Sequence, residues 1–381
     1  MTIPFAGLPV GVLLPKSWEN GSLLVISFLL LLLGAEVFTN GVEWLGHRLG
    51  VSESATGSIL AATGTALPET TIPIIAIIQG GHAAESVGVG AILGAPFMLA
   101  TIALFLVGVS LYYFADRRTH GTELDFNETS TSRDVSFFLV GYLLAFVAAL
   151  IASHVVRVAI AVSLVGLYLV YLYRSLKTGD LVETDDLDDL HVGLVLERVL
   201  GVFGREPEDH SGDPHFLLVA LQTLVALSFI VGGARLFVTE VEWASLTVLG
   251  IPTAVVALLI APVATELPET FNSVLWISRD KETLALGNIT GAMAFQGTLP
   301  VAIGILFTPW DLSFTWGTSG FLNAFSVVLA LVSGVILYSR VRRVGSSNMT
   351  SKPFLLGGLF YLAFIGLAIY YVLFVGVAGV N

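Results

Sequence analysis

The chain has 381 residues, of which 55% are hydrophobic and 12% are charged, and its formal net charge is −12. Soluble proteins carry roughly 25% charged residues, so the composition excludes an ordinary water-soluble domain and predicts a polytopic protein embedded in the lipid bilayer. The sequence contains no cysteine, which excludes disulfides, thiolate metal sites and cysteine nucleophiles. No basic segment precedes a short apolar core near the start, so we expect no cleavable signal peptide.

Ten apolar stretches follow one another along the chain, and a helix needs about 20 residues to cross a bilayer. They are residues 22–45, 56–78, 86–114, 135–151, 155–176, 215–238, 251–278, 283–307, 321–339 and 353–377. The sequence therefore predicts an all-α membrane protein with ten transmembrane helices. We divide it into a first five-helix half at 1–177, an acidic linker at 178–213 and a second five-helix half at 214–381.

The linker carries an acidic run at residues 183–189, which reads Glu-Thr-Asp-Asp-Leu-Asp-Asp. It lacks the glycine and the ligand spacing of an EF-hand loop, so a solvated linker is preferred over a regulatory Ca²⁺ site. We also expect a short amphipathic helix at 191–203. Arginine outnumbers lysine 13 to 4, and an acidic, lysine-poor soluble face suits the high-salt cytoplasm of a halophilic prokaryote. The alternative is that one acidic loop accounts for the charge.

The basic residues predict how the chain is oriented, because Lys and Arg gather in cytoplasmic loops. If the N-terminus lies outside, 14 of the 17 basic residues fall in inner loops or at their helix ends. The exceptions are Lys16, Arg157 and Arg235. We therefore expect a multi-pass protein of the plasma membrane with both termini outside and the linker in the cytoplasm.

Two segments 200 residues apart are nearly identical. The first is Gly64-Thr65-Ala66-Leu67-Pro68-Glu69-Thr70, and the second is Ala264-Thr265-Glu266-Leu267-Pro268-Glu269-Thr270. The similarity extends to residues 38–44 against 237–243 and to residues 90–95 against 287–292. The motifs lie on spans two and seven, which cross the membrane in opposite directions because they are five spans apart, an odd number. This pattern predicts an inverted repeat, which in transporters places a shared binding site near the bilayer midplane.

Each motif places a proline inside an apolar helix. Pro68 and Pro268 have no amide hydrogen to donate to the carbonyl one turn earlier. The carbonyls of Gly64 and Ala264 therefore lose their usual partners, at a cost of several kcal/mol in lipid. If these carbonyls face an internal cavity, they can coordinate a cation instead.

Each motif also places a carboxylate deep in the bilayer, which costs at least about 2.5 kcal/mol on insertion scales. A single buried glutamate could be a protonated acid bonded to a neighbouring helix, but the duplication of Glu69 in Glu269 favours a cation site. Calcium prefers six to eight oxygen ligands. The two carboxylates would bind the metal, and the hydroxyls of Thr65 and Thr265 would add further oxygens.

Spans three and eight, which follow the motif helices, carry glycines four residues apart. The pairs are Gly90 with Gly94 and Gly287 with Gly291. Small residues at this spacing allow two helices to approach closely. We therefore expect both spans to pack against the proline-containing helices.

Both halves resemble the alpha-repeats of the calcium/cation antiporter superfamily, which includes Na⁺/Ca²⁺ and H⁺/Ca²⁺ exchangers. That family usually has Gly-Thr-Ser-x-Pro-Glu on the kinked helix and Gly-Ser-Asn-x-x-Asn/Asp on the next one. The resemblance covers about residues 34–109 and 230–307. It implies ten helices, alternating access and ion ligation by Glu69 and Glu269.

The chain departs from the family pattern at several positions, and two of them, Ala95 and Ala292, lack the usual hydroxyl. Ala66 replaces the usual serine, and Glu266 takes the equivalent place in the second half. Leu99 and Gln296 stand where the polar residues of the next helix are expected, so that Gln296 is a neutral amide ligand and multi-sodium stoichiometry is in doubt. Glu266 shares a helix face with Glu269, and their repulsion in a desolvated cavity would favour a protonated carboxyl, which suits proton exchange. Alternatively, Glu266 is a surface-directed acid near the helix mouth.

The sequence thus predicts a secondary antiporter that exchanges Ca²⁺, or a related divalent cation, for Na⁺ or H⁺ by alternating access. The alternatives are a cation channel and an exchanger of a different cation, with Mg²⁺ disfavoured by its strict octahedral geometry. We expect no enzyme, because the chain has no cysteine and no HExxH-like run. Besides the transported ions we expect no cofactor, no nucleic-acid binding and no obligate protein partner.

Overall fold

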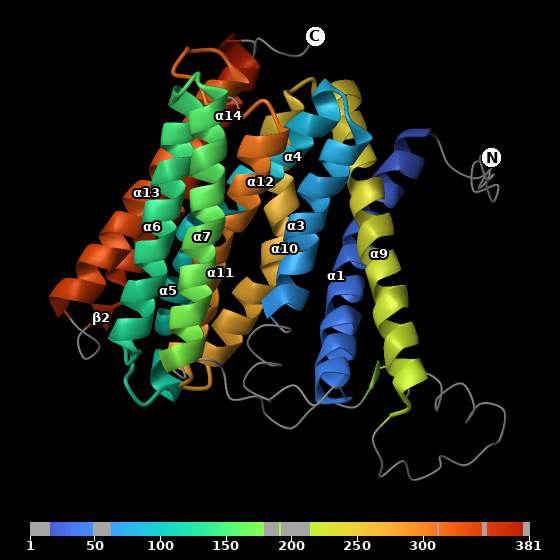
Figure 1. Ribbon diagram of the computed structural model, residues 1–381. Coiled ribbons are helices and arrows are strands. Elements are labelled where there is room, and N and C mark those ends of the chain that lie inside the picture. The colour runs from blue at the N-terminus through green and yellow to red at the C-terminus, as the bar shows by residue number, and fades with distance from the viewer. Residues whose placement is uncertain are drawn as a thin grey trace.

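The computed structural model of the chain describes residues 16–48, 62–178, 190–191, 214–310, 312–344 and 349–375. These parts are almost entirely helical, and they contain nine helices or helix pairs that are long and apolar enough to cross a membrane (Figure 1). The nine coincide with nine of the ten predicted spans. The remaining predicted span coincides with α3, Ala62–Gln79, whose described apolar part, Leu67–Gln79, is shorter.

The first half contains five predicted crossings, one of which includes a π-helical turn. Its elements are α1 (Lys16–Arg48), α3, α4 (His82–Met98), the π-helical turn η2 (Leu99–Ala103), α5 (Leu104–Tyr113), the 3₁₀ turn η3 (Ala115–Arg117), α6 (Glu128–Leu150) and α7 (His154–Thr178). The turn η2 joins α4 to α5 without a break in the helical path.

The second half has the same succession of crossings. Its elements are α9 (Phe216–Trp243), the π-helical turn η4 (Ala244–Leu249), α10 (Thr253–Ile277), α11 (Glu282–Gln296), α12 (Leu299–Phe307), α13 (Ser319–Val344), α14 (Lys352–Tyr370) and the π-helical turn η6 (Tyr371–Val375). Two short strands, β1 (Glu123–Leu124) and β2 (Met349–Thr350), pair antiparallel and link the two halves.

Corresponding helices of the two halves run in opposite directions. In Figure 1, α1 descends beside the ascending α9, and α3 ascends while α10 descends. Helices α1 and α9 approach closely through glycines: a Cβ added to Gly34 would lie 2.9 Å from Ile230 Cγ1, and one added to Gly233 would lie 3.0 Å from Leu30 Cβ. The predicted all-α fold of two inverted repeats is therefore confirmed.

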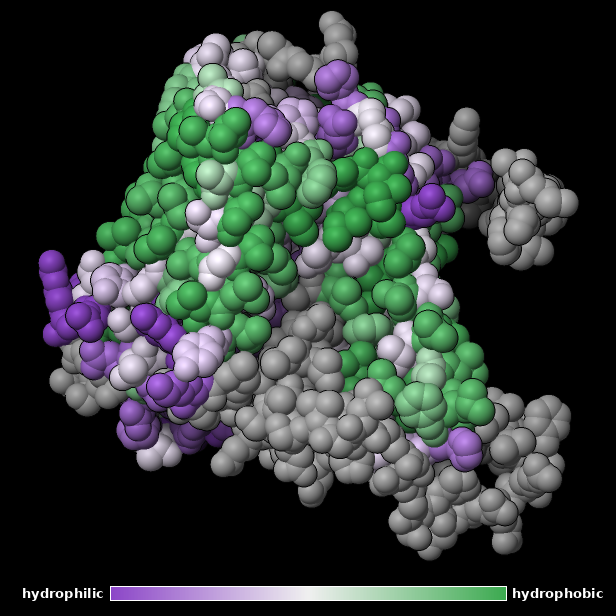
Figure 2. Space-filling view, viewed as in Figure 1, coloured by the Kyte–Doolittle hydropathy of each residue, from purple (hydrophilic) through white to green (hydrophobic). Residues whose placement is uncertain are grey.

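The outer surface is that of a protein surrounded by lipid. Figure 2 shows hydrophobic side chains over the middle of this face and hydrophilic side chains towards its two ends. Helix α1 begins and α14 ends at one side of the bundle, whereas α7 ends and α9 begins at the other (Figure 1). Both described ends of the chain thus share a side, as an even number of crossings requires.

The first predicted glycine pair packs tightly, and it does so against the opposite half. A Cβ added to Gly90 would lie 2.8 Å from Ala257 Cβ, and one added to Gly94 would lie 2.6 Å from Pro262 Cγ. Both neighbours belong to α10. The close approach expected of span three is therefore confirmed, and its partner is the proline-containing helix of the second half.

Span eight, α11, also packs against its proline-containing helix, α10, but not through its two glycines. A Cβ added to Gly287 would meet no described atom within 4 Å. A Cβ added to Gly291 would lie 3.5 Å from the hydroxyl oxygen of Tyr171, its nearest described neighbour. This tyrosine belongs to α7. Helix α11 therefore packs on α6 and α10 through other residues, and among the described residues no helix backbone lies against its two glycines.

The loops at the linker side are tied together by a buried ion pair. Arg118, which follows η3, bonds Glu282 at the start of α11, and both side chains are buried. The neighbouring Thr119 hydroxyl donates to Asp280 at 3.0 Å. These two contacts attach the α10–α11 connection to the loop before α6. They therefore hold the end of α10 and the start of α11 in place.

Within the predicted linker the structure describes only two residues after Thr178. Leu190 is buried, and the backbone amide of His191 donates to Asn40 Oδ1 at 3.2 Å. The same oxygen accepts from Gln222 Nε2 of α9 at 2.8 Å. The acidic run at 183–189 and the expected amphipathic helix beyond His191 lie outside the described residues.

Candidate cation site

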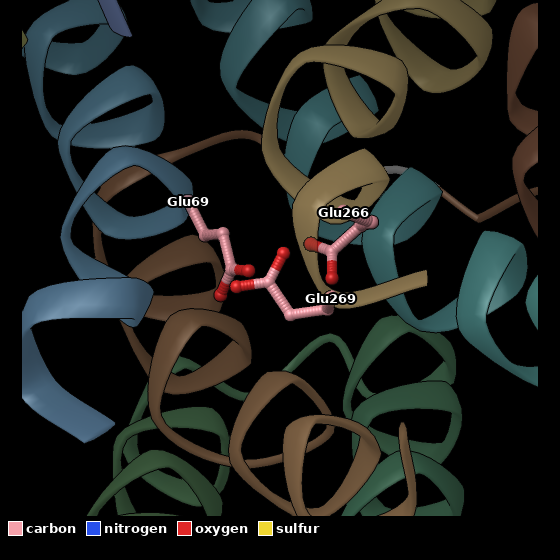
Figure 3. Close-up of side chains that lie close together, drawn as sticks. All are labelled: Glu69, Glu266 and Glu269. Atoms are coloured by element: carbon pink, nitrogen blue, oxygen red, sulfur yellow. The ribbon is translucent and has the colours of Figure 1, made fainter. Parts of the chain in front are cut away.

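Three carboxylates from both halves meet inside the bundle (Figure 3). Glu69 comes from α3, and Glu266 and Glu269 come from α10. One oxygen of each lies within 4.8 Å of the others. All three side chains are buried, with exposed fractions of 7%, 0% and 8% respectively. The sequence correctly placed Glu69 and Glu269 in buried spans, and the fold brings them together.

Glu266 is the third member of this cluster. Its complete burial rules out the alternative of a surface-directed acid at a helix mouth. Its Oε1 accepts a hydrogen bond from the Thr265 hydroxyl at 3.2 Å. The predicted site residue Thr265 therefore touches the cluster through Glu266.

Helix α10 continues through Pro268, and hydroxyls and an amide satisfy the carbonyls beside it. The Glu266 carbonyl accepts from Thr270 Oγ1 at 2.7 Å, and the Glu269 carbonyl accepts from Ser273 Oγ at 2.9 Å. Asn288 of α11 also donates to the Glu269 carbonyl, at 2.9 Å. These bonds fix the backbone that carries the two carboxylates.

Three of the residues predicted to line the site fall outside the part of the chain whose side chains the structure describes. They are Gly64, Thr65 and Ala264. The predicted role of the Thr65 hydroxyl, and of the carbonyls released by Pro68 and Pro268, therefore stays a prediction.

Gln296 joins the cluster from the end of α11. Its Nε2 donates to Glu69 Oε2 and lies 3.4 Å from Glu266 Oε1. The side chain is almost completely buried. Gln296 thus contacts carboxylates of both halves at once.

Helix α6 holds the chain at the point where Gln296 is presented. Helix α11 ends at Gln296, and the chain turns at Gly297 and Thr298 before α12 begins. A Cβ on Gly141 of α6 would lie 2.6 Å from the Gly297 carbonyl, and one on Gly297 would lie 2.9 Å from a Phe138 ring carbon. Only glycine at both positions lets α6 lie so close to this turn.

The cluster carries more negative charge than its protein neighbours compensate. Two carboxylates 4.8 Å apart repel each other by about 3.5 kcal/mol at an effective dielectric constant of about 20. Glu266 Oε2 and Glu269 Oε2 are buried and have no hydrogen-bond partner among the described residues. Buried charges need partners, so the arrangement is suited to holding a cation or protons.

The model of the sodium/calcium exchanger protein family matches residues 21–177 and 218–378, which is most of the chain. The chain belongs to this family. The comparison with curated proteins found no match.

Several solved structures share the fold of this family member. The H⁺/Ca²⁺ exchanger CAX is 17% identical, with a TM-score of 0.64 over 93% of this chain and 85% of that one. The sodium-calcium exchanger NCX_Mj is 18% identical, with a TM-score of 0.53 over 92% and 98% of the two chains. Native YfkE is 13% identical, with a TM-score of 0.62 over 94% and 93%. At these identities the similarity establishes the architecture alone.

Two further polar residues lie near the carboxylates in sequence or in space, and only one of them supports the cluster. Asn288 supports the backbone of Glu269, a role that the sequence analysis missed. The aligned glycines at 90 and 287 place Asn288 opposite Ala91 of the first half, so a comparison of the repeats could have found it. By contrast, Asn272 of α10 is exposed, so it does not extend the polar cluster.

Proposed function

We propose that the chain is a secondary-active antiporter that exchanges Ca²⁺, or a related divalent cation, for Na⁺ or H⁺. The observation that carries this proposal is the meeting of three buried carboxylates, contributed by both inverted halves, in a member of the sodium/calcium exchanger family. Glu69 and Glu269 would be the principal metal ligands, with Glu266 beside them. No other cofactor is needed for this chemistry.

The donor set fits the preferences of calcium. Ca²⁺ takes six to eight oxygen ligands, both carboxylates and neutral oxygens. Three carboxylates offer up to six oxygens, and the Thr265 hydroxyl adds a neutral one, while the amide nitrogen of Gln296 bonds two of the carboxylates. The two buried carboxylate oxygens without partners would then gain a positive ion as their partner.

Alternating access would follow from the inverted repeat. The pair α1 and α9 packs closely through Gly34 and Gly233 and borders α3, which carries Glu69. Sliding of this pair along the remaining helices would open the site first to one side and then to the other. One cavity that must hold either Ca²⁺ or the counter-ion in order to move gives exchange without ATP.

Ca²⁺ flux in proteoliposomes under separately imposed Na⁺ and pH gradients tests the proposal. If the protein is an exchanger, Ca²⁺ uptake should stop when the counter-gradient is removed. Whichever of the Na⁺ and pH gradients drives uptake identifies the counter-ion. Uncoupled current with no dependence on a counter-gradient would identify a channel and overturn the proposal. Asp125→Asn is the control variant, since Asp125 is an exposed acid in the loop before α6.

We also propose that both termini lie outside and that the linker at 178–213 lies in the cytoplasm, joining the halves at 1–177 and 214–381. Because the chain has no cysteine, single cysteines report sidedness directly. The α6–α7 and α10–α11 turns lie on opposite sides of the bundle (Figure 1) and contain the exposed Ser153 and Lys281 respectively. Ser153→Cys should react with impermeant reagents from outside, and Lys281→Cys from inside. The reverse labelling would invert the assignment.

A further inference from the structure

The second half differs from the first at two positions that touch each other in the structure. Glu266 stands opposite Ala66 in the internal repeat, and Gln296 stands opposite Leu99. Gln296 Nε2 lies 3.4 Å from Glu266 Oε1. Two polar departures from the repeat, 30 residues apart in sequence, thus form one contact in the site.

The amide nitrogen of Gln296 suits this place because of its hydrogens. A glutamine amide has two donor hydrogens, whereas an ionised carboxylate only accepts. One hydrogen serves Glu69 Oε2 and the other points to Glu266 Oε1. If the amide were turned over, its oxygen would face two carboxylates and repel both. Gln296 therefore bridges a carboxylate of α3 and a carboxylate of α10.

The bridge also decides which oxygens remain for an ion. Glu266 Oε1 accepts from both Thr265 and Gln296. Its other oxygen, Oε2, is buried and has no hydrogen-bond partner among the described residues. The pair thus holds the third carboxylate, which faces Glu69 and Glu269 (Figure 3), in one orientation and leaves one of its oxygens uncommitted.

We propose that Glu266 and Gln296 act as one unit that sets the selectivity of the site for a divalent over a monovalent cation. Glu266 supplies the third negative charge of the site. Gln296 is uncharged, so it adds no fourth negative charge, and its amide orients Glu266 and Glu69. A carboxylate at position 296 would place a fourth negative charge beside them. A glutamine at position 266 would leave two, which favours binding of singly charged ions. This inference rests on the proposed function of the same site.

The test exchanges the two groups between the two positions. Glu266→Gln, Gln296→Glu and the double variant that combines them are compared with wild type. The double variant again has three carboxylates and one amide, placed the other way round. Glu266→Gln removes a charge from the contact, and Gln296→Glu replaces the donor that orients Glu69 and Glu266 by a further acceptor. Disrupting a buried charged contact costs about 2 to 5 kcal/mol, so each single change should raise the Ca²⁺ KM by about 30-fold or more. The double variant should return to within about 5-fold of wild type, because the lost contact is rebuilt.

A second readout separates this inference from the proposed function. Stabilisation of detergent-solubilised protein by Ca²⁺ and by Na⁺ is measured by thermal unfolding, which needs no transport. Glu266→Gln should lower the ratio of Ca²⁺ to Na⁺ affinity by at least about 10-fold, as expected when one charge facing a divalent ion is lost. If wild type binds Ca²⁺ with this pattern but shows no counter-gradient-driven uptake, the exchange function fails and the selectivity pair stands.

Two controls sharpen the interpretation. Glu269→Gln combined with Gln296→Glu also has three carboxylates, but Glu269 makes no described hydrogen bond to Gln296, so it should not recover. If Gln296→Glu fails to fold, Gln296→Leu, which restores the first-half residue, replaces it in a cycle with Glu266→Gln. Two outcomes would overturn the proposal. In the first, the fold-changes in Ca²⁺ KM of the two single variants multiply to give that of the double variant, so that the two residues act independently. In the second, the variant with the two groups exchanged has a Ca²⁺ KM no lower than that of the poorer single variant.

Discussion

Replacing Glu269 by glutamine keeps the shape of the side chain and removes one negative charge from the cluster. Because the three carboxylates lie within 4.8 Å of one another, Glu269 takes part in two repulsive pairs, each worth about 3.5 kcal/mol when ionised at an effective dielectric constant of about 20. The substitution therefore relieves as much as about 7 kcal/mol of repulsion in the absence of a cation. The variant should fold and should be no less stable than wild type in a chelator.

The same substitution should abolish Ca²⁺ uptake. Loss of a charged partner in a buried contact costs about 2 to 5 kcal/mol, which weakens Ca²⁺ binding by about 30-fold or more. The stabilisation that a fixed Ca²⁺ concentration gives to the folded protein should then fall by about 2 kcal/mol or more. Unfolding temperatures in chelator and in millimolar Ca²⁺, measured beside proteoliposome uptake, separate the two effects.

Two results would refute this reasoning. Wild-type uptake and wild-type Ca²⁺ stabilisation in Glu269→Gln would remove Glu269 from the site. An unfolding temperature in chelator well below that of wild type would mean that the carboxylate has a structural partner rather than repulsive neighbours. The exposed Asp125→Asn should behave as wild type in both assays.

Three further changes test the packing around the site. Gly94→Ala forces a Cβ against Pro262 and the Leu258 carbonyl, so it should destabilise the protein by about 1 to 3 kcal/mol and slow uptake. Gly287→Ala, with no described atom within 4 Å of the new Cβ, is the matched control, and equal effects would contradict the α4–α10 packing. Arg118→Gln leaves Glu282 buried without its arginine partner and should lower the free energy of unfolding by about 3 to 5 kcal/mol. An unchanged unfolding temperature would show that this ion pair does not stabilise the fold. Asn288→Ala removes a hydrogen bond to the Glu269 carbonyl and should raise the Ca²⁺ KM by about 5-fold with folding retained, since one such bond is worth about 1 kcal/mol. An unchanged KM would show that Asn288 does not position Glu269.

The local features of the sequence predicted most of the fold. The apolar stretches placed the helices, because the bilayer leaves few alternatives for twenty successive apolar residues. The repeated proline-glutamate motif on spans of opposite direction predicted the inverted halves. It also identified Glu69 and Glu269 as candidate ligands, because an ionisable side chain in lipid marks a functional position.

The orientation of individual side chains depended on packing between distant segments. The sequence left open whether Glu266 faces the cavity or the surface, and only the approach of α3 decided the question. The bridge from Gln296 to Glu69 joins residues 227 apart in sequence. Likewise, Gly90 and Gly94 pack on α10 while Gly287 and Gly291 do not, although the two pairs have the same spacing.

The sequence by itself therefore determined which residues are costly in lipid, on which spans they lie and that the spans are inverted. Such properties depend on side-chain type and on spacing along one helix. The tertiary structure decided that three carboxylates and one amide share a single site and that the repeats are unequal around it. Helices that are apolar on nearly every face show little periodicity that could reveal which side turns towards a neighbour. That choice is made by close contacts between helices far apart in the chain.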